Sequence, residues 1–393
     1  MPVAPLDSAS HLPNQSVSVL GSSELSAARF ANLHLLDTEP AYSLKTHLRR
    51  RLVRGLHYLS HCSGLSSLYA RIKARVKGES VATVLMYHSV PAPHERPWMD
   101  PRNCLMPEQF EAQMAFLARY RNVISMEQLI RQLAKRRPIR RGTVAITFDD
   151  GYLNNLRVAA PILAKYSLPA TLYLATAYVA AGQNQWIDTL YSAFRARSQH
   201  RLNLSALGWG DWQLSDVSVC ESAYRAIASR LIECLPAQRQ AVLSEIDAQL
   251  APTVYPPRLT MNWDEVRELR ERFPNVTLGV HTANHIDLST HSEQCDREME
   301  LSIAQVLAET GDRPQHLAFP YNRYNAHSQE QVAAHLRSAV AMTADPVVRA
   351  TTPRYAIPRL EAPQELWLLK SWTDGGFPDF TQRFFGRAWT SAH

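Results

Sequence analysis

Two adjacent carboxylates, Asp149 and Asp150, end a short apolar stretch of this chain and are followed by Gly151. Residues 144–146 predict a buried strand before the acids, and the glycine predicts a turn after them. Because the chain turns at a strand end, both side chains can face one cavity. Two acids placed there can divide the chemistry, one binding a metal ion and the other accepting a proton. Asp-Asp-Gly is also a common turn sequence, so the pair needs partners elsewhere.

Two histidines, His281 and His285, follow another apolar stretch at residues 277–280. Their spacing puts both on one side of a helical turn, close enough to share a cation. One carboxylate and two imidazoles leave a coordination position open for water, which is typical of a catalytic zinc site. Cobalt, nickel and manganese accept the same ligands. The alternative is a polar loop with two unrelated histidines.

Two further apolar stretches also end at or near residues that can do chemistry. Residues 84–90 read Val-Leu-Met-Tyr-His-Ser-Val and contain His88. Residues 316–322 read His-Leu-Ala-Phe-Pro-Tyr-Asn and contain Tyr321. Each stretch predicts a strand that delivers a polar or aromatic group at its end.

With Tyr-His-Ser-Val, Thr-Phe-Asp-Asp-Gly, His-x-x-x-His and Phe-Pro-Tyr in this order, the chain resembles the polysaccharide deacetylases of the NodB-homology type. These are metal-dependent enzymes that remove N-acetyl or O-acetyl groups from glycans, and the resemblance covers about residues 81–361. It implies that Asp149 is the general base and that the backbone N–H of Tyr321 stabilises the oxyanion. The metal ligands that it implies are Asp150, His281 and His285.

The third motif departs from the family pattern. Many members carry an arginine two positions before the proline and a glycine after the aromatic residue, where this chain has Ala318 and Asn322. The oxyanion donor implied at Tyr321 is a backbone group and depends on neither side chain.

The general acid of the family, in a Leu-x-x-His motif near the C-terminus, is missing here. After Arg354 the only histidine is His393, the last residue. Residues 85–88 have the Leu-x-x-His form at the front of the domain, and some relatives are circularly permuted. We therefore expect His88 to be the general acid, with a structural histidine at a strand end as the alternative.

Arg359 stands where relatives often carry an arginine at the end of the last strand. The resemblance implies that it orients Asp149 or holds the substrate, and an exposed structural arginine is the alternative.

Strands and helices must alternate to bring these residues together. The chain has 393 residues and 46% hydrophobic content, enough for one large α/β domain with appendages. Helical patterns at residues 106–120 and 298–309 lie between strand candidates, which favours parallel strands. The resemblance sharpens this to a distorted, seven-stranded (β/α) barrel at residues 81–365. The strand candidates are residues 81–90, 142–149, 170–177, 277–281, 316–321, 338–343 and 354–361.

A helical insertion at about residues 182–257 interrupts the barrel pattern. Residues 222–234 and 237–250 both show helical spacing. The insertion either caps the site and selects the glycan or packs on the barrel. Trp186 and Tyr191 either stack on sugar rings or belong to a core.

The ends of the chain differ from the barrel in composition. Residues 1–27 are rich in Ser, Pro and small residues and predict disorder, and residues 28–80 predict a basic helical extension. This extension either contacts an anionic membrane surface peripherally or is a solvated helix on the barrel. No nucleic-acid recognition motif is present. Residues 366–393 form an aromatic tail that docks on the barrel or meets a partner or membrane.

The chain shows no signal-peptide pattern and no apolar run near the length of a membrane span. Its 5 cysteines are odd in number and lack paired spacing. These features predict reduced thiols and a cytoplasmic protein, peripheral at the inner membrane face if the basic extension binds there.

The expected function is a metal-dependent hydrolase that removes N- or O-linked acetyl groups from a glycan, glycolipid or polysaccharide precursor. The expected cofactor is Zn²⁺, with Co²⁺, Ni²⁺ or Mn²⁺ as alternatives. Two other functions stay open: hydrolysis of a non-carbohydrate C–N bond on the same barrel, and a non-catalytic role in exopolysaccharide assembly.

Overall fold

The computed structural model describes residues 81–374 and four isolated upstream positions, Gly55, Tyr58, Leu68 and Ile72. Several predictions concern residues outside this range. They are the disorder of residues 1–27, most of the basic extension with its membrane contact, Cys62, and the aromatic tail beyond residue 374.

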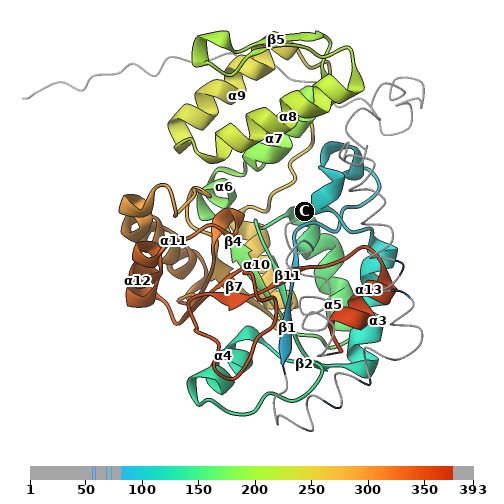
Figure 1. Cartoon of the computed structure of the whole chain (residues 1–393), viewed down its shortest axis with the longest axis vertical. Coiled ribbons are helices and arrows are strands. Elements are labelled where there is room, and N and C mark those ends of the chain that lie inside the picture. The colour runs from blue at the N-terminus through green and yellow to red at the C-terminus, as the bar shows by residue number, and fades with distance from the viewer. Residues whose placement is uncertain (1–54, 56–57, 59–67, 69–71, 73–80, 375–393) are drawn as a thin grey trace, which may run out of the picture. The chain divides into compact units, whose positions relative to one another are not determined.

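The described residues build one parallel sheet that curls into a barrel (Figure 1). All neighbouring strands along it run parallel. Each of the seven expected ranges contains or overlaps a strand, if β10 and β11 are taken as one interrupted strand, so the predicted fold class is confirmed. In spatial order the strands are β10 (Ile357–Pro358), β9 (Ser338–Ala341), β8 (His316–Ala318), β7 (Val276–Val280), β4 (Ala170–Leu174), β3 (Thr143–Phe148), β1 (Ala82–Tyr87) and β11 (Leu360–Glu361).

The barrel nearly closes at Arg359, which interrupts the last strand. The residues before it, β10, pair with β9. The residues after it, β11, pair with β1. The chain therefore leaves one edge of the sheet and joins the other within a few residues, and Arg359 lies at that junction.

Helices cover the outside of the barrel, and their apolar faces explain why the strands are buried. Every residue of β1 and β3 is buried, as expected for parallel strands that are covered on both faces. The covering helices are α3 (Pro107–Tyr120), α5 (Ala160–Lys165), α10 (Trp263–Arg272), α11 (Cys295–Thr310), α12 (Ala326–His335) and α13 (Leu366–Trp372). Helix α4 (Met126–Ala134) packs instead with a separate cluster that contains Ala82 and Val84 of β1 and Ala145 of β3.

The two helices predicted between strand candidates are present as α3 and α11. Helix α10 begins at the capping box that its sequence predicts. Asn262 accepts from the N–H of Glu265, and the Glu265 side chain accepts from the N–H of Asn262. In α13, the first part of the aromatic tail, Trp372 is buried, and its carbonyl accepts from Thr83 of β1 at 3.1 Å. This part of the tail docks on the barrel.

The insertion follows α6 (Thr176–Ala181) and contains more than helices. Its helices are α7 (Trp186–Ala196), α8 (Val217–Ile232) and α9 (Pro236–Leu250). A hairpin of β5 (Arg201–Asn203) and β6 (Asp211–Gln213) joins α7 to α8. The purely helical prediction was therefore incomplete. Strands of three residues with one buried side chain leave too little periodicity to be recognised.

The insertion has its own hydrophobic core, separate from that of the barrel. Trp186 and Tyr191 both belong to it, and Tyr191 is fully buried. Stacking of Tyr191 on a sugar ring is therefore wrong, and the core interpretation holds. Figure 1 shows α7, α8 and α9 grouped together beside the barrel.

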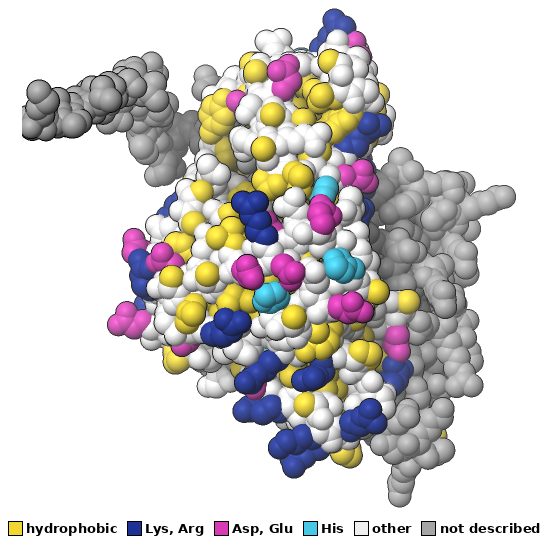
Figure 2. Space-filling view, turned by 90° about the vertical axis from the view of Figure 1, so that its left-hand side faces the viewer, with side chains coloured by type: hydrophobic (Ala, Val, Ile, Leu, Met, Phe, Trp, Pro, Cys, Tyr) yellow, Lys and Arg dark blue, Asp and Glu magenta, His cyan; other side chains and the backbone are white. Residues whose placement is uncertain are grey.

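Basic side chains gather at one end of the face shown in Figure 2, its lower end. In Figure 1 that end contains α4 and β2 (Asn122–Val123), a short strand that pairs with β3 and was not expected. The segment from α4 to β3 is rich in Lys and Arg, and it precedes the N-terminal end of β3. No helix among the described residues has the length and apolar character to cross a bilayer.

Candidate metal centre and active site

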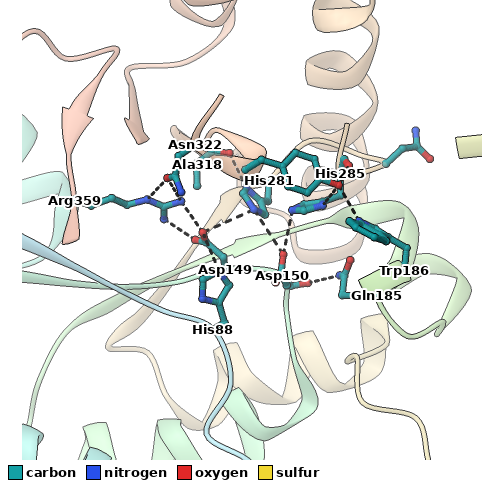
Figure 3. Close-up of polar contacts among 12 residues, drawn as sticks. His88, Asp149, Asp150, Gln185, Trp186, His281, His285, Ala318, Asn322 and Arg359 are labelled. Atoms are coloured by element: carbon teal, nitrogen blue, oxygen red, sulfur yellow. Dashed lines mark hydrogen bonds and ion pairs between the residues drawn. The ribbon is translucent and has the colours of Figure 1, made fainter. Parts of the chain in front are cut away.

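Three predicted ligands, Asp150, His281 and His285, meet at the C-terminal ends of β3 and β7 (Figure 3). Asp150 Oδ1 lies 3.6 Å from His281 Nε2 and 3.4 Å from His285 Nε2. All three residues are buried. Tetrahedral zinc with bonds of about 2.0–2.1 Å separates its ligand atoms by about 3.3 Å, so this spacing fits one metal ion.

The unsatisfied groups of the site also fit a cation. Asp150 Oδ1 is buried and accepts no hydrogen bond from any described residue. His281 directs Nδ1 at the carbonyl oxygen of Ala318, 2.7 Å away, which places the proton on Nδ1 and leaves the Nε2 lone pair toward Asp150. A buried carboxylate oxygen without a donor is costly unless a cation compensates for it.

The second histidine is oriented by a tyrosine hydroxyl. His285 Nδ1 lies 3.0 Å from Tyr321 Oη, and Tyr321 Oη donates to the His285 carbonyl at 3.0 Å. Trp186 Nε1 donates to the same hydroxyl at 2.8 Å. The side chain of Tyr321, for which the sequence predicted only a backbone role, therefore supports a candidate metal ligand.

The loop that carries the two histidines is not a helical turn, so that part of the prediction was wrong. Residues 281–285 contain no helix, and Thr282 and His285 have φ of 61° and 50°. Glu298 of α11 holds the loop: its carboxylate accepts from the N–H groups of Ala283 and Asn284 at 2.9 and 2.8 Å. The two histidines converge because Glu298 holds the backbone of this loop, and not because of helical spacing.

Backbone strain concentrates at the site. Positive φ in residues other than glycine costs about 1–3 kcal/mol each and persists where surrounding contacts enforce it. Of the described residues with this conformation outside glycine, most lie at the metal centre or its supports. They are Asp150, Thr282, His285, Tyr321 and Asn322.

Asp149, the predicted base, forms a two-point ion pair with Arg359. Arg359 Nη1 and Nη2 donate to its two carboxylate oxygens at 2.7 and 2.6 Å, and both side chains are buried. Asp149 Oδ2 also lies 3.8 Å from His281 Nε2. Arg359 therefore orients Asp149, which was one of the two roles expected, and it is not an exposed structural arginine.

Asn322 stands where many family members have glycine, and it has a role in this pair. Its Oδ1 accepts from Arg359 Nε at 3.4 Å and Nη2 at 3.3 Å, and from the N–H of Met342 at 2.9 Å. With a φ of 56°, Asn322 adopts the left-handed conformation that glycine or asparagine tolerates best. Asn322 thus suits this backbone conformation and supplies an acceptor for the arginine.

The two adjacent carboxyls are shifted in opposite directions. Burial raises the pKa of Asp149, but Arg359 and His281 outweigh it and hold that pKa below its ordinary value. Burial, reinforced by Asp149 and Asp188, raises the pKa of Asp150 well above its ordinary value. Burial also lowers the pKa of His281 to about 4. The two shifts favour the charged carboxylate at Asp149 and the neutral acid at Asp150, unless a cation lies beside Asp150.

His88 lies beside these groups. His88 Nε2 is 4.0 Å from Asp149 Oδ2, and its side chain is 19% exposed, so a substrate can reach it. Burial lowers the pKa of His88, against the opposing effect of Asp149. No hydrogen bond from the Tyr321 N–H is found among the described residues. All seven residues predicted for the site are thus brought together at one end of the barrel.

Four residues that support the site had no role in the predictions, although Asn322 lies in the third motif. Glu298 and Asn322 hold the ligand loop and the arginine from the barrel side. From the insertion, Gln185 Nε2 donates to the carbonyl of Asp150 at 3.1 Å, and Arg239 donates to the carbonyl of His285 at 3.2 Å. Their roles come from tertiary contacts, which are not visible in the sequence.

A cavity of about 700 Å³ lies within the insertion, between α7, α9 and the segment that follows α9. Trp186, Arg239 and Asn284 contribute to its lining, but none of the seven predicted site residues does. This cavity is therefore separate from the candidate metal ligands and from Asp149.

The chain was then compared with known proteins. A family model described as polysaccharide deacetylase matches residues 136–202 and 237–339. These segments contain Asp149, the three metal-ligand candidates and Tyr321, whereas His88 and Arg359 lie outside them. No protein of curated function matches the chain.

Several solved structures are similar to this chain, at low identity. The Streptococcus pyogenes deacetylase PplD, in complex with acetate, is 18% identical, with coverage of 75% of this chain and 99% of its own and a TM-score of 0.49. IcaB from Ammonifex degensii is 14% identical, with coverage of 75% and 97% and a TM-score of 0.48. A putative polysaccharide deacetylase, BA0330 from Bacillus anthracis, is 15% identical, with coverage of 76% and 69% and a TM-score of 0.48.

At these identities the family assignment rests on the family model and on the residues that it covers. The matched segments hold the Asp-Asp pair, both histidines and the Phe-Pro-Tyr motif, and the structure brings all of them to one end of a parallel barrel. The chain therefore carries a domain of the polysaccharide deacetylase family, hydrolases that act on acetyl amide or ester bonds.

Proposed function

We propose that this protein is a metal-dependent deacetylase of a glycan or glycolipid. One observation carries the proposal: a buried carboxylate, Asp149, is held in its charged form by Arg359 beside a three-residue metal site. A base and an open metal site side by side are what hydrolysis of an unreactive acetyl amide or ester needs.

Asp150, His281 and His285 would hold the ion. A divalent metal bound there would lower the pKa of a water molecule and polarise the acetyl carbonyl. Zinc fits the two imidazoles and one carboxylate, and cobalt, nickel and manganese are alternatives.

Asp149 accepts the proton of the attacking water. Its Oδ2 faces the site, since it is the oxygen nearest to His88 and His281. Arg359 fixes the carboxylate at two points, so its orientation does not have to be found during the reaction. As the family resemblance implies, the N–H of Tyr321 would donate to the negative oxygen that develops on the acetyl group. Loss of one such donor costs about 3 kcal/mol of transition-state stabilisation.

His88 is proposed as the proton donor to the leaving amine or alkoxide. It is partly exposed and lies 4.0 Å from Asp149 Oδ2. Burial lowers the pKa of His88, and the Asp149 carboxylate opposes that effect. The reaction would release acetate and a free amine or hydroxyl on the sugar.

The test combines metal analysis with acetate release for the wild type and Asp149→Asn. The substrates are acetylated sugars, chitooligosaccharides and glycolipids. We expect one metal per chain in both proteins and a loss of about 10²- to 10⁴-fold in turnover for the variant. Metal without acetate from any substrate would favour another C–N bond hydrolase or a non-catalytic protein, and absence of metal after reconstitution would refute the site.

A further inference from the structure

The helical insertion reaches the metal ligands at several points. The indole N–H of Trp186, at the start of α7, donates a hydrogen bond to the Tyr321 hydroxyl, and this hydroxyl is hydrogen-bonded to His285 Nδ1 (Figure 3). Arg239 of α9 donates a hydrogen bond to the carbonyl of His285, and Gln185 donates one to the carbonyl of Asp150. Two of the three candidate ligands are therefore supported by the insertion as well as by the barrel.

Donors and acceptors can be assigned around the Tyr321 hydroxyl. An indole N–H can only donate, so Trp186 occupies one lone pair of the Tyr321 oxygen. When the hydroxyl hydrogen goes to the carbonyl of His285, the other lone pair accepts from His285 Nδ1–H. Every donor is then used once, and His285 Nε2 keeps the lone pair that a metal needs.

Arg239 supports the same residue through its backbone. This arginine is only 1% exposed, and no carboxylate partner for it is found among the described residues. Its Nε and Nη2 donate to the backbone carbonyls of Leu231 and Cys234, near the C-terminal end of α8, at 3.0 and 3.1 Å. Its Nη1 donates to the carbonyl of His285, so one buried guanidinium joins the insertion to the ligand loop.

Trp186 and Arg239 also contact each other, because the guanidinium lies 5.2 Å from the indole ring centre. A buried charge without a counterion is expensive, so simple packing would be served better by an apolar side chain. The position of this charge is explained if its purpose is to hold the loop that presents His285.

We propose that Trp186 and Arg239 are positioning residues of the metal centre, which act on His285 through Tyr321 and through its backbone carbonyl. This inference rests on the metal site of the proposed function. It means that the insertion is a structural part of the metal site and not a detachable cover over it.

The test measures the Zn²⁺ dissociation constant of the full chain by competition with a chromophoric chelator. Trp186→Phe removes the indole N–H and keeps most of the ring. Trp212→Phe is the matched control, because this tryptophan is also in the insertion and donates its N–H to a carbonyl, that of Trp209, at 3.1 Å. We expect Zn²⁺ to bind about 10- to 100-fold more weakly in Trp186→Phe, as for other residues that orient metal-binding histidines, and unchanged in the control.

Two further measurements separate positioning from general destabilisation. The melting temperatures of the metal-free Trp186→Phe and Trp212→Phe proteins should fall by similar amounts. The double variant Trp186→Phe, Tyr321→Phe should bind Zn²⁺ no more weakly than Tyr321→Phe alone, because Trp186 acts through that hydroxyl. Visible absorption of the Co²⁺ form should change in Trp186→Phe, since the geometry of His285 changes.

The outcomes distinguish this inference from the proposed function. Equal Zn²⁺ affinity in Trp186→Phe and wild type would overturn the inference and leave the deacetylase proposal intact. Additive losses in the double variant would show that Trp186 does not act through Tyr321. A wild type that binds no Zn²⁺ would overturn the metal site, and the inference with it.

Discussion

Arg359 determines the charge of the base at the scale of single residues. Its guanidinium donates to both oxygens of Asp149, and both groups are buried. Without this partner, burial would favour the neutral acid, which cannot accept a proton. Because the arginine lowers the pKa of Asp149, the carboxylate is present at lower pH than burial alone would allow.

Removal of Arg359 should therefore move the pH dependence of catalysis. In Arg359→Gln the pKa of Asp149 rises, so the acid limb of kcat/KM shifts to higher pH. The measurement is the pH profile of acetate release for wild type and variant. An acid limb at the same pH in both would show that it does not report Asp149.

The same substitution should also reduce stability, because a buried carboxylate loses its partner. A loss of about 3–5 kcal/mol is expected for breaking a buried ion pair on one side. Denaturant unfolding near pH 7 measures it. The expected loss is smaller at pH values where Asp149 is protonated, and a loss independent of pH would point to packing.

The ligand loop is held at the scale of elements, by helix α11. Glu298 accepts from two backbone N–H groups and from the side chain of Asn284 at 2.7 Å, so its carboxylate replaces the hydrogen bonds that a regular element would provide. The loop can then keep the left-handed residues that point both histidines at Asp150.

Neutralising this acid should loosen the loop. In Glu298→Gln one acceptor oxygen becomes a donor, so we expect about 1–3 kcal/mol of lost stability and weaker Zn²⁺ binding. Glu300→Gln is the control, because Glu300 lies on the same helix and is exposed. Thermal unfolding and chelator competition measure both effects, and equal behaviour of the two variants would contradict the role of Glu298.

The elements were predictable where their periodicity is long and regular. Buried strands such as β3 and helices such as α3 follow from apolar runs and from 3.6-residue spacing. The hairpin β5–β6 and the loop at residues 281–285 were not predictable, because tertiary contacts set them. The four-residue spacing of His281 and His285 would be the same in a helix, so the sequence could not show that they lie in a loop held by Glu298.

The pH dependence of stability belongs to the scale of the whole molecule. Asp188 of α7 is buried in the insertion, and burial raises its pKa from 3.8 to about 8. A carboxyl with a raised pKa contributes its full stability below its unfolded pKa and loses it as the pH rises toward the folded pKa. This contribution therefore falls between about pH 4 and pH 8.

Asp188→Asn should remove that loss. We expect the variant to be more stable than wild type by a few kcal/mol at pH 8 and nearly equal at pH 4, since one pKa unit is worth about 1.4 kcal/mol. Denaturant unfolding at both pH values measures the difference. The control is the exposed Glu271→Gln, for which no such difference is expected. A constant difference across this range would contradict the prediction.

Of the whole site, only the residues expected to bind the metal or to accept the proton could be predicted firmly from the sequence. Asp149, Asp150, His281 and His285 stand in motifs, and the barrel topology explains why they meet. The sequence singles out Trp186 and Asn322, but the supporting roles of Trp186, Arg239 and Asn322 could not be predicted from it. These roles depend on which groups of other segments lie within hydrogen-bonding reach. His88 and Arg359 are intermediate, because their places rest on β1 and β11 becoming neighbours.

The closing strand also has a consequence for how the protein folds. Arg359 and Asp149 are 210 positions apart in sequence, and they pair where β11 joins β1. Contacts between such distant segments form late, because the entropy of closing a long loop must be lost first. A chain with complete helices but an open barrel would therefore have no oriented base. Recovery of activity during refolding should lag behind recovery of helical circular dichroism, so activity reports the last step of folding.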